Sequence, residues 1–333
     1  MPETRRFILY FLTLRRVSII IFIRNYKTEI FRVGDAEDFG NTWVIFYMHK
    51  VQAKGILGSG NGMNVYRGCS HGCIYCDARS DCYQMTHEFE DIEVKENAPE
   101  LLEAALKAKR RRCMIGTGAM CDPYLHEERE LCVTRRCMEI IEKHGFGVTV
   151  LTKSDLIMRD IELLEEINDN AKAVVQMTLT TADEELCRIV EPNVCTTARR
   201  AEVLLEMKKR GIPTAVWFTP LLPFINDTEE NVREIVRICA ECGVFGIVTF
   251  GMGLTLRSGD REYFYSALDR HFHGLKERYI ATYGNAYELP VPNAARLWSI
   301  FDEECAKYGI ECIPERVFEF LREFPEAEQL RLI

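Results

Sequence analysis

The chain has 333 residues, of which 47% are hydrophobic and 28% are charged, and its formal net charge at pH 7 is −9. These are ordinary values for a folded enzyme, and they exclude a disordered, collagen-like or polytopic membrane protein. The negative charge also argues against a protein that is held on nucleic acid mainly by bulk positive charge.

Residues 1–47 differ in composition from the rest of the chain. They contain seven basic and five acidic residues and ten aromatic residues. Arg15 and Arg16 interrupt the apolar run at residues 7–23, and the two remaining segments are too short to cross a bilayer. We therefore expect an extension of doubtful structural role before Met48 rather than a membrane anchor, and no contact with a membrane.

From residue 113 onward, short apolar runs rich in β-branched residues alternate with amphipathic segments. Each run has the length and composition of a buried parallel strand, and the runs cover residues 113–118, 148–151, 173–179, 214–218 and 246–250. Four amphipathic segments end in a glycine that suits a helix C-cap, namely Gly145, Gly211, Gly243 and Gly309. The alternation predicts right-handed βα units.

With a short first strand at Met63 to Tyr66, the count is six strands. The predicted fold class is α/β, a partial and open six-stranded parallel βα barrel, because a closed barrel normally has eight strands. Further helices are predicted at about 260–281, 293–308 and 314–323. This divides the chain into the extension (1–47), a core (48–260) and a C-terminal helical region (261–333), with the active site at the carboxyl ends of the strands.

The chain contains 14 cysteines and shows no secretory signal with a small-residue cleavage site. We interpret most of them as small buried hydrophobic residues in a reducing cytosol, which predicts a cytoplasmic protein. Cys239 and Cys242 form a C-x-x-C pair that leaves an auxiliary metal site open.

Three cysteines are different, because Cys69, Cys73 and Cys76 form C-x3-C-x2-C in a glycine-rich loop after the first predicted strand. Three thiolates from one short loop fit a 4Fe–4S cluster in which one iron has no cysteine ligand. The alternative is zinc with His71 or Cys82 as the fourth ligand, although structural zinc loops usually supply ligands as two separated pairs.

The motif and its context resemble the radical SAM superfamily. Tyr75 stands directly before the last cysteine, and the segments GAMCDPY, VLTKSDLIMRD, IVEP and PLLPFINDT are similar to the spore photoproduct lyase-like branch, also called DNA repair photolyase-like. The resemblance spans roughly residues 60–260. It implies a 4Fe–4S cluster that binds S-adenosylmethionine (SAM) at its open iron and cleaves it reductively to methionine and a 5′-deoxyadenosyl radical. The electron would come from a reducing protein of the flavodoxin or ferredoxin type.

A SAM site follows from the same resemblance and from positions at the strand ends. The expected residues are Tyr75 near the adenine, Gly116 and Gly118 at the methionine part, Lys153 at the carboxylate, Thr178 and Thr180 at the ribose, and Arg199 or its neighbour Arg200 facing the site. Each also has a structural interpretation, as a loop aromatic residue, a turn glycine, a solvated cation or strand filler.

Cys121 follows the second strand of the repeat, beside the expected reaction site. A thiol there suits a catalytic hydrogen donor to a product radical, as in some photoproduct lyases, and a buried structural role is the alternative. The expected reaction is therefore repair of a DNA photoproduct or a related lyase reaction. A radical SAM enzyme that modifies a non-DNA substrate, or a non-catalytic iron–sulfur or zinc protein, remains the alternative.

Two features suggest a route to DNA. The basic run at residues 107–112 suits phosphate contacts or a solvated helix end. The last residues, Gln329 to Ile333, resemble the short peptide by which bacterial DNA-processing proteins bind the sliding clamp, with Ile333 in place of the usual aromatic residue.

Overall fold

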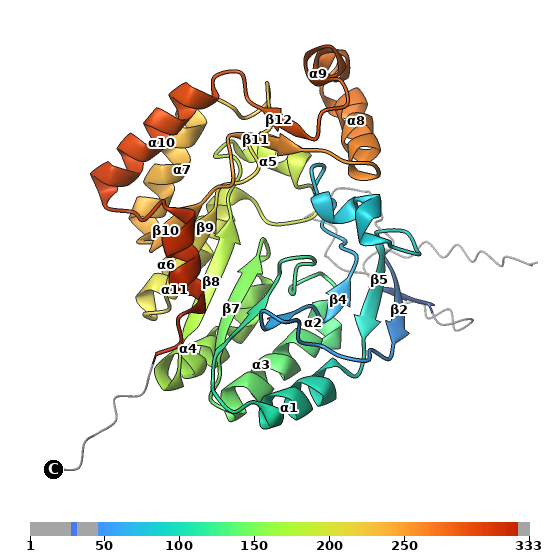
Figure 1. The fold of residues 1–333 in the computed structure, drawn as a ribbon, viewed down its shortest axis with the longest axis vertical. Coiled ribbons are helices and arrows are strands. Elements are labelled where there is room, and N and C mark those ends of the chain that lie inside the picture. Colours follow the sequence, from blue (N-terminus) through green and yellow to red (C-terminus); the bar gives the residue numbers. More distant parts are fainter. Residues whose placement is uncertain (1–27, 32–45, 326–333) are drawn as a thin grey trace, which may run out of the picture.

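Six parallel strands form the central sheet of the protein (Figure 1), whose computed structural model describes residues 28–31 and 46–325. The strands lie in the order β10-β9-β8-β7-β6-β3. They are β3 (Gly62–Met63), β6 (Met114–Thr117), β7 (Gly147–Thr152), β8 (Ala173–Thr178), β9 (Thr214–Trp217) and β10 (Gly246–Val248). The edge strands β3 and β10 do not pair with each other, so the predicted partial, open barrel is confirmed.

The first strand differs from the prediction. The segment expected as one strand at Met63 to Tyr66 belongs to two sheets, because β3 ends at Met63 and β4 (Tyr66–Arg67) runs antiparallel to β5 (Asp91–Lys95). The second sheet has the order β1-β2-β5-β4, where β1 is Thr28–Phe31 and β2 is Phe46–Val51. This sheet was not predicted, since its pairs join segments that are distant in the sequence. In it, Met48 pairs with Ile92, and both side chains are buried.

Alternate residues of the six strands face opposite sides of the central sheet, as the pleat requires. One set, with Ile115 and Val175 among them, packs against helices that follow the strands. These helices are α1 (Ala98–Ala108), α3 (Val133–Lys143), α4 (Ile161–Asn170), α6 (Thr197–Lys209) and α7 (Glu229–Cys242). The glycines after four of the predicted helices have positive φ, as their capping role requires.

The other face is apolar near the strand starts and polar further along. Val174 and Val248 pack with Val317 and Leu321 of α11 (Pro314–Arg322), which lies beside β10 (Figure 1). One step further along the strands, Gln176 donates to Thr149 and accepts from Trp217. Helix α11 therefore closes one end of the barrel interior and leaves the carboxyl ends of the strands open to a site.

The C-terminal part adds α8 (Asp260–His271), α9 (Leu275–Tyr283), α10 (Ala294–Tyr308) and a small sheet of β11 (Gly253–Thr255) with β12 (Glu288–Pro290). The helix expected at about 260–281 is two helices, because Gly274 has a φ of 79° and interrupts the helical backbone. Helix α10 packs against α7 (Figure 1). Among the described residues, no helix is both long and apolar enough to cross a bilayer.

Candidate active site

The loop that carries the three cysteines leaves β4 at Gly68. Gly68 has a φ of 86°, and a Cβ there would lie 2.5 Å from the backbone oxygen of Phe89, so a side chain does not fit. Directly after it, the Cys69 amide donates to the same Phe89 oxygen over 3.0 Å. On the other side, the Asn193 side chain donates to the Ser70 carbonyl over 2.9 Å. Hydrogen bonds to the backbone of the loop therefore hold it from both sides, one from a neighbouring backbone and one from a side chain.

The three cysteines line one cavity of about 290 Å³ at the carboxyl ends of the parallel strands, which we call the strand-end cavity. Cys69 and Cys73 are buried and Cys76 is half-buried. Burial raises the pKa of all three thiols, that of Cys73 to about 12. A bound metal centre would offset this cost, because metal coordination stabilises thiolates.

The spacing of the sulfur atoms tests the two metal centres considered from the sequence. The sulfurs of Cys69, Cys73 and Cys76 do not all lie within 4.8 Å of one another, and no two of them form such a group with His71 or Cys82. Tetrahedral zinc with Zn–S bonds of about 2.3 Å needs sulfurs about 3.8 Å apart. In this arrangement the donors do not surround a single zinc ion, whereas three thiols from one loop suit a cluster whose ligands bind different irons.

Several predicted SAM-site residues reach the strand-end cavity. Tyr75, Gly118, Lys153 and Thr178 all line it together with the cysteines. The Lys153 ammonium lies 5.8 Å from the centre of the Tyr75 ring. Burial by itself lowers the pKa of Lys153, but Cys73, Glu191 and Cys76 outweigh it and raise the pKa above its usual value. Lys153 is therefore a cation held beside the cysteine loop.

The structure places three other predicted residues outside this cavity. Gly116 lies within β6, where it pairs with Gly62 and Thr149. The Thr180 carbonyl accepts from two asparagine side chains in the interior. Arg199 is exposed and forms ion pairs of 2.8 Å and 2.7 Å with two surface carboxylates, those of Asp155 and Glu202.

The inward-facing arginine is Arg200, which is fully buried. It donates to the Thr178 carbonyl over 3.0 Å and forms a 2.5 Å ion pair with Glu191. Glu191 in turn accepts a hydrogen bond from the Tyr75 hydroxyl. Glu191 was not selected from the sequence, although it is the acidic residue of the IVEP segment, and this segment was the available signal.

Asp122 is a second residue that sequence reasoning missed, and it joins three parts of the site. One oxygen accepts from the Thr152 hydroxyl over 2.7 Å and the other accepts from the Lys153 amide over 2.7 Å. The second oxygen also lies 3.4 Å from Nδ1 of His71 in the cysteine loop. Burial lowers the pKa of His71 to about 4 against the opposing effect of Asp122, so His71 is neutral at pH 7.

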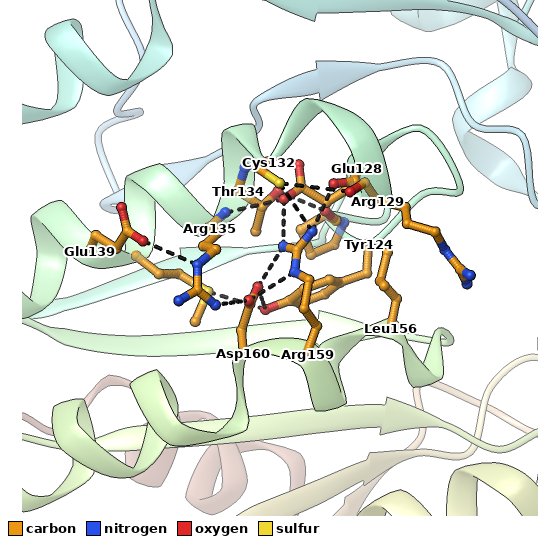
Figure 2. A network of polar contacts seen from close by, with 12 residues as sticks. Tyr124, Glu128, Arg129, Cys132, Thr134, Arg135, Glu139, Leu156, Arg159 and Asp160 are labelled. Carbon is orange, nitrogen blue, oxygen red and sulfur yellow. Dashed lines mark hydrogen bonds and ion pairs between the residues drawn. The ribbon is translucent and has the colours of Figure 1, made fainter. Parts of the chain in front are cut away.

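A buried polar network holds the segment that follows β6 (Figure 2). Arg159 bridges Glu128 at 2.8 Å and Asp160 at 2.7 Å, and both carboxylates are fully buried. Arg135 forms a 2.6 Å ion pair with Asp160, which also accepts from the Tyr124 hydroxyl over 3.1 Å. The network ties the segment carrying Cys121 and Asp122 to the start of α4.

Cys121 is buried at the meeting point of two cavities. Its thiol donates to the Gly68 carbonyl over 2.7 Å, and it lines both the strand-end cavity and a neighbouring cavity of about 300 Å³ that Tyr66 and Lys95 also line. A third cavity of about 470 Å³ shares Thr219, Pro220, Leu254 and Thr255 with the strand-end cavity. Its other walls include the aromatic residues Phe250, Tyr287 and Trp298.

The remaining sequence predictions lie elsewhere. Cys239 and Cys242 are buried on α7, and among the described residues they form no group with a third His, Cys, Asp or Glu in which all donor atoms lie within 4.8 Å of one another. In the basic run, Lys107 pairs with Glu103 and Lys109 donates to Asn61. The tail from Gln329 to Ile333 lies outside the described residues.

Comparison with known proteins agrees with this architecture. The family model described as the radical SAM superfamily matches residues 63–237. An uncharacterised protein of Mycobacterium tuberculosis is 30% identical over 239 residues, which cover 68% of each chain. An uncharacterised protein of Methanocaldococcus jannaschii is 29% identical over 174 residues, which cover 52% of this chain and 64% of that protein.

Solved structures of spore photoproduct lyase share the fold. A mutant with bound AdoMet and dinucleoside spore photoproduct has a TM-score of 0.55 at 13% identity, with 74% of each chain covered. A complex with dinucleoside spore photoproduct has a TM-score of 0.58 at 12% identity, with 80% of each chain covered. Together with the family match, these findings confirm the resemblance seen in the sequence: the chain belongs to the radical SAM superfamily.

Proposed function

We propose that this chain is a radical SAM enzyme that holds a 4Fe–4S cluster through Cys69, Cys73 and Cys76. The observation that carries the proposal is the convergence of these three thiols on one cavity at the carboxyl ends of the parallel strands. When bound, the cluster supplies the electron that cleaves SAM to methionine and a 5′-deoxyadenosyl radical, which abstracts a hydrogen atom from the substrate.

The chain's own residues would bind and orient SAM in the strand-end cavity. Lys153 offers a cation to the SAM carboxylate, and Tyr75, whose ring centre lies 5.8 Å from the Lys153 ammonium, offers an aromatic surface to the adenine. Thr178 offers a hydroxyl at the end of β8. Glu191 and Arg200 would fix the positions of Tyr75 and Thr178. Glu191 accepts a hydrogen bond from the Tyr75 hydroxyl, and Arg200 donates to the Thr178 carbonyl.

For the substrate, we propose a DNA photoproduct or a related lyase substrate. Two observations support this: the shared fold with spore photoproduct lyase and the thiol of Cys121 beside the cysteine loop. Cys121 would return a hydrogen atom to the substrate-derived radical. The third cavity shares four lining residues with the strand-end cavity, and its aromatic walls suit a planar ring system.

The proposed reaction needs an external electron source, for which a flavodoxin- or ferredoxin-type protein is the expected partner. Contact with DNA through the basic run at 107–112 and with a sliding clamp through Gln329 to Ile333 also remains a proposal. A titration of the clamp with a labelled peptide of residues 320–333, against the peptide with Gln329, Leu330 and Leu332 changed to Ala, tests the latter. Equal binding of the two peptides would contradict it.

The central experiment is detection of 5′-deoxyadenosine after anaerobic reconstitution and reduction in the presence of SAM. Cys69→Ala, Cys73→Ala and Cys76→Ala should each abolish the product and the brown chromophore, because two thiolates do not hold the cluster. Cys82→Ala is the matched control, since its thiol is close in sequence but exposed, and it should retain both. Product formation by any of the first three variants would contradict the proposal, whereas irradiated DNA as substrate tests the lyase reaction separately.

A further inference from the structure

A group of histidine and carboxylate side chains lies on the second sheet, away from the strand-end cavity. His49 is on β2, Asp91 begins β5, and His87 lies in the segment that leads into β5. Glu93, two residues after Asp91, pairs with His49 across the parallel strands. None of these residues was selected from the sequence, because they come from two segments that are about 40 residues apart and join only when β2 pairs with β5.

The separations within this group suit a single divalent metal ion. One ring nitrogen of each histidine and one oxygen of Asp91 all lie within 4.8 Å of one another. Nδ1 of His49 is 3.0 Å from Asp91, and Nε2 of His87 is 3.7 Å from Glu93. A tetrahedral ion with bonds of about 2.0–2.2 Å needs adjacent ligand atoms about 3.3–3.6 Å apart, so these three residues need only small side-chain shifts. Glu93 is not part of the group within 4.8 Å and would have to turn toward the ion to be its fourth ligand.

The hydrogen bonding of His87 independently indicates a ligand. Its Nδ1 lies 3.0 Å from the Glu88 carbonyl, which only accepts, so Nδ1 carries the proton. Its Nε2 is therefore the nitrogen with the free lone pair in the neutral ring, and this atom is buried without a hydrogen-bond partner. A ring that donates one N–H to a backbone carbonyl while the other nitrogen faces carboxylates is the usual arrangement of a metal-binding histidine.

We propose that His49, His87 and Asp91, with Glu93 as the fourth ligand, form a second metal site that takes a divalent transition metal of the Zn²⁺ class. Two imidazoles and two carboxylates suit this class better than Mg²⁺ or Ca²⁺, which prefer oxygen ligands. The negative charges of the Asp91 and Glu93 carboxylates would also balance the double positive charge of the metal ion.

The site lies close in the chain to a segment that contacts the cysteine loop. The metal would join β2 to the segment around His87, and two residues later the Phe89 carbonyl accepts the hydrogen bond from the Cys69 amide. The side chains are only partly exposed, between 15% for His87 and 29% for Asp91, so the ion would lie within the sheet surface with access from solvent. The inference does not depend on the proposed reaction.

The test measures zinc and iron in the same full-length, anaerobically reconstituted protein. After dialysis against zinc and removal of free metal, mass spectrometry should give about one zinc per chain in the wild type. His49→Ala and His87→Ala should bind zinc at least about tenfold more weakly, with iron content unchanged. His271→Ala is the matched control, since this histidine is exposed on α8, and it should keep its zinc.

Two further measurements keep the result decisive. X-ray absorption at the zinc edge should show only nitrogen and oxygen ligands, whereas sulfur ligands would mean that zinc occupies the cysteine loop and would overturn the proposal. His87→Gln, which keeps the polarity and much of the volume of the side chain, should lose zinc while it keeps iron and the wild-type circular dichroism spectrum. Retention of zinc by the histidine variants, or no zinc in the wild type, would leave only a His49–Asp91 hydrogen bond.

Discussion

Glu191 and Arg200 form an ion pair in which neither side chain is exposed to solvent. Burial by itself raises the pKa of Glu191, but Arg200 and then Lys153 outweigh it and hold the pKa below its usual value. The Glu191 carboxylate is therefore charged at neutral pH and accepts the hydrogen bond of Tyr75 from the cysteine loop. Through this pair, helix α6 supports the loop that we propose to hold the cluster.

Adjacent arginines on α6 give a matched test of this support. Arg200→Met should destabilise the protein by about 3–5 kcal/mol, because it leaves the Glu191 charge buried without a partner. Arg199→Met should change the free energy of unfolding by less than about 1 kcal/mol, since its ion pairs are exposed. Urea denaturation of both variants measures the difference, and equal effects would contradict the assignment of Arg200 as the inward residue.

The network in Figure 2 makes a second prediction. Arg159→Met removes the cation between Glu128 and Asp160, both of which are fully buried. The expected cost is about 3 kcal/mol or more in the free energy of unfolding. Arg129→Met, which changes an arginine in the same segment that forms no ion pair with either of these carboxylates, serves as the control. Similar unfolding midpoints for the two variants would show that the network does not stabilise the segment after β6.

The proposed role of Cys121 predicts a change in the reaction products rather than in the stability of the protein. If its thiol returns a hydrogen atom to the substrate radical, Cys121→Ala should keep iron and still form 5′-deoxyadenosine, but the products from irradiated DNA should change. Cys113→Ala is the control, because this half-buried cysteine lines none of the three cavities described. Liquid chromatography with mass spectrometry of the digested DNA compares the products, and an unchanged distribution in Cys121→Ala would assign Cys121 a structural role.

The buried carboxyl group of Asp260 should make the stability of the protein depend on pH. Burial, followed by the charge of Asp77, raises the pKa of Asp260 from 3.8 to about 6, against a backbone hydrogen bond from Arg257. One of its oxygens is buried without a hydrogen-bond partner. Between about pH 4 and pH 6 the folded state binds this proton more tightly than the unfolded state, so its contribution to stability falls as the pH rises.

The corresponding variant is Asp260→Asn. Above pH 6 it should be more stable than the wild type by about 2–3 kcal/mol, and the difference should disappear near pH 4. Asp269→Asn on the same helix is the control, since its ion pair with Lys276 is exposed, and it should not change with pH in this way. A constant difference between Asp260→Asn and wild type from pH 4 to pH 8 would exclude the raised pKa.

The boundary proposed at Met48 can be tested by truncation. A chain that begins at Met48 keeps the pairs of Met48 to Val51 with β5 and the buried Met48 side chain, although it loses β1 and the first two residues of β2. We expect it to remain soluble, to take up iron and to cleave SAM. Loss of iron or solubility, measured beside the full chain, would show that the extension is part of the fold.

The sequence by itself determined the features that depend on local patterns. Apolar runs at regular intervals predicted five of the six parallel strands, because a strand that is buried on both faces needs apolar residues throughout. The spacing of Cys69, Cys73 and Cys76 predicted that the three thiols lie together on one loop, and all three line the strand-end cavity; that they bind a metal stays a prediction. Lys153 and Cys121 were found for a similar reason, since residues that follow parallel strands meet at one edge of the sheet.

Only the tertiary structure decided which residues face one another. Arg199 and Arg200 are indistinguishable in sequence, but neighbours on a helix point about 100° apart, and the packing of α6 turns Arg200 inward. The pairing of β2 with β5 likewise brings His49 to Asp91 across 42 residues. Non-local pairing of this kind depends on the burial of the whole sheet rather than on any local motif, and no pattern within either segment contains that information.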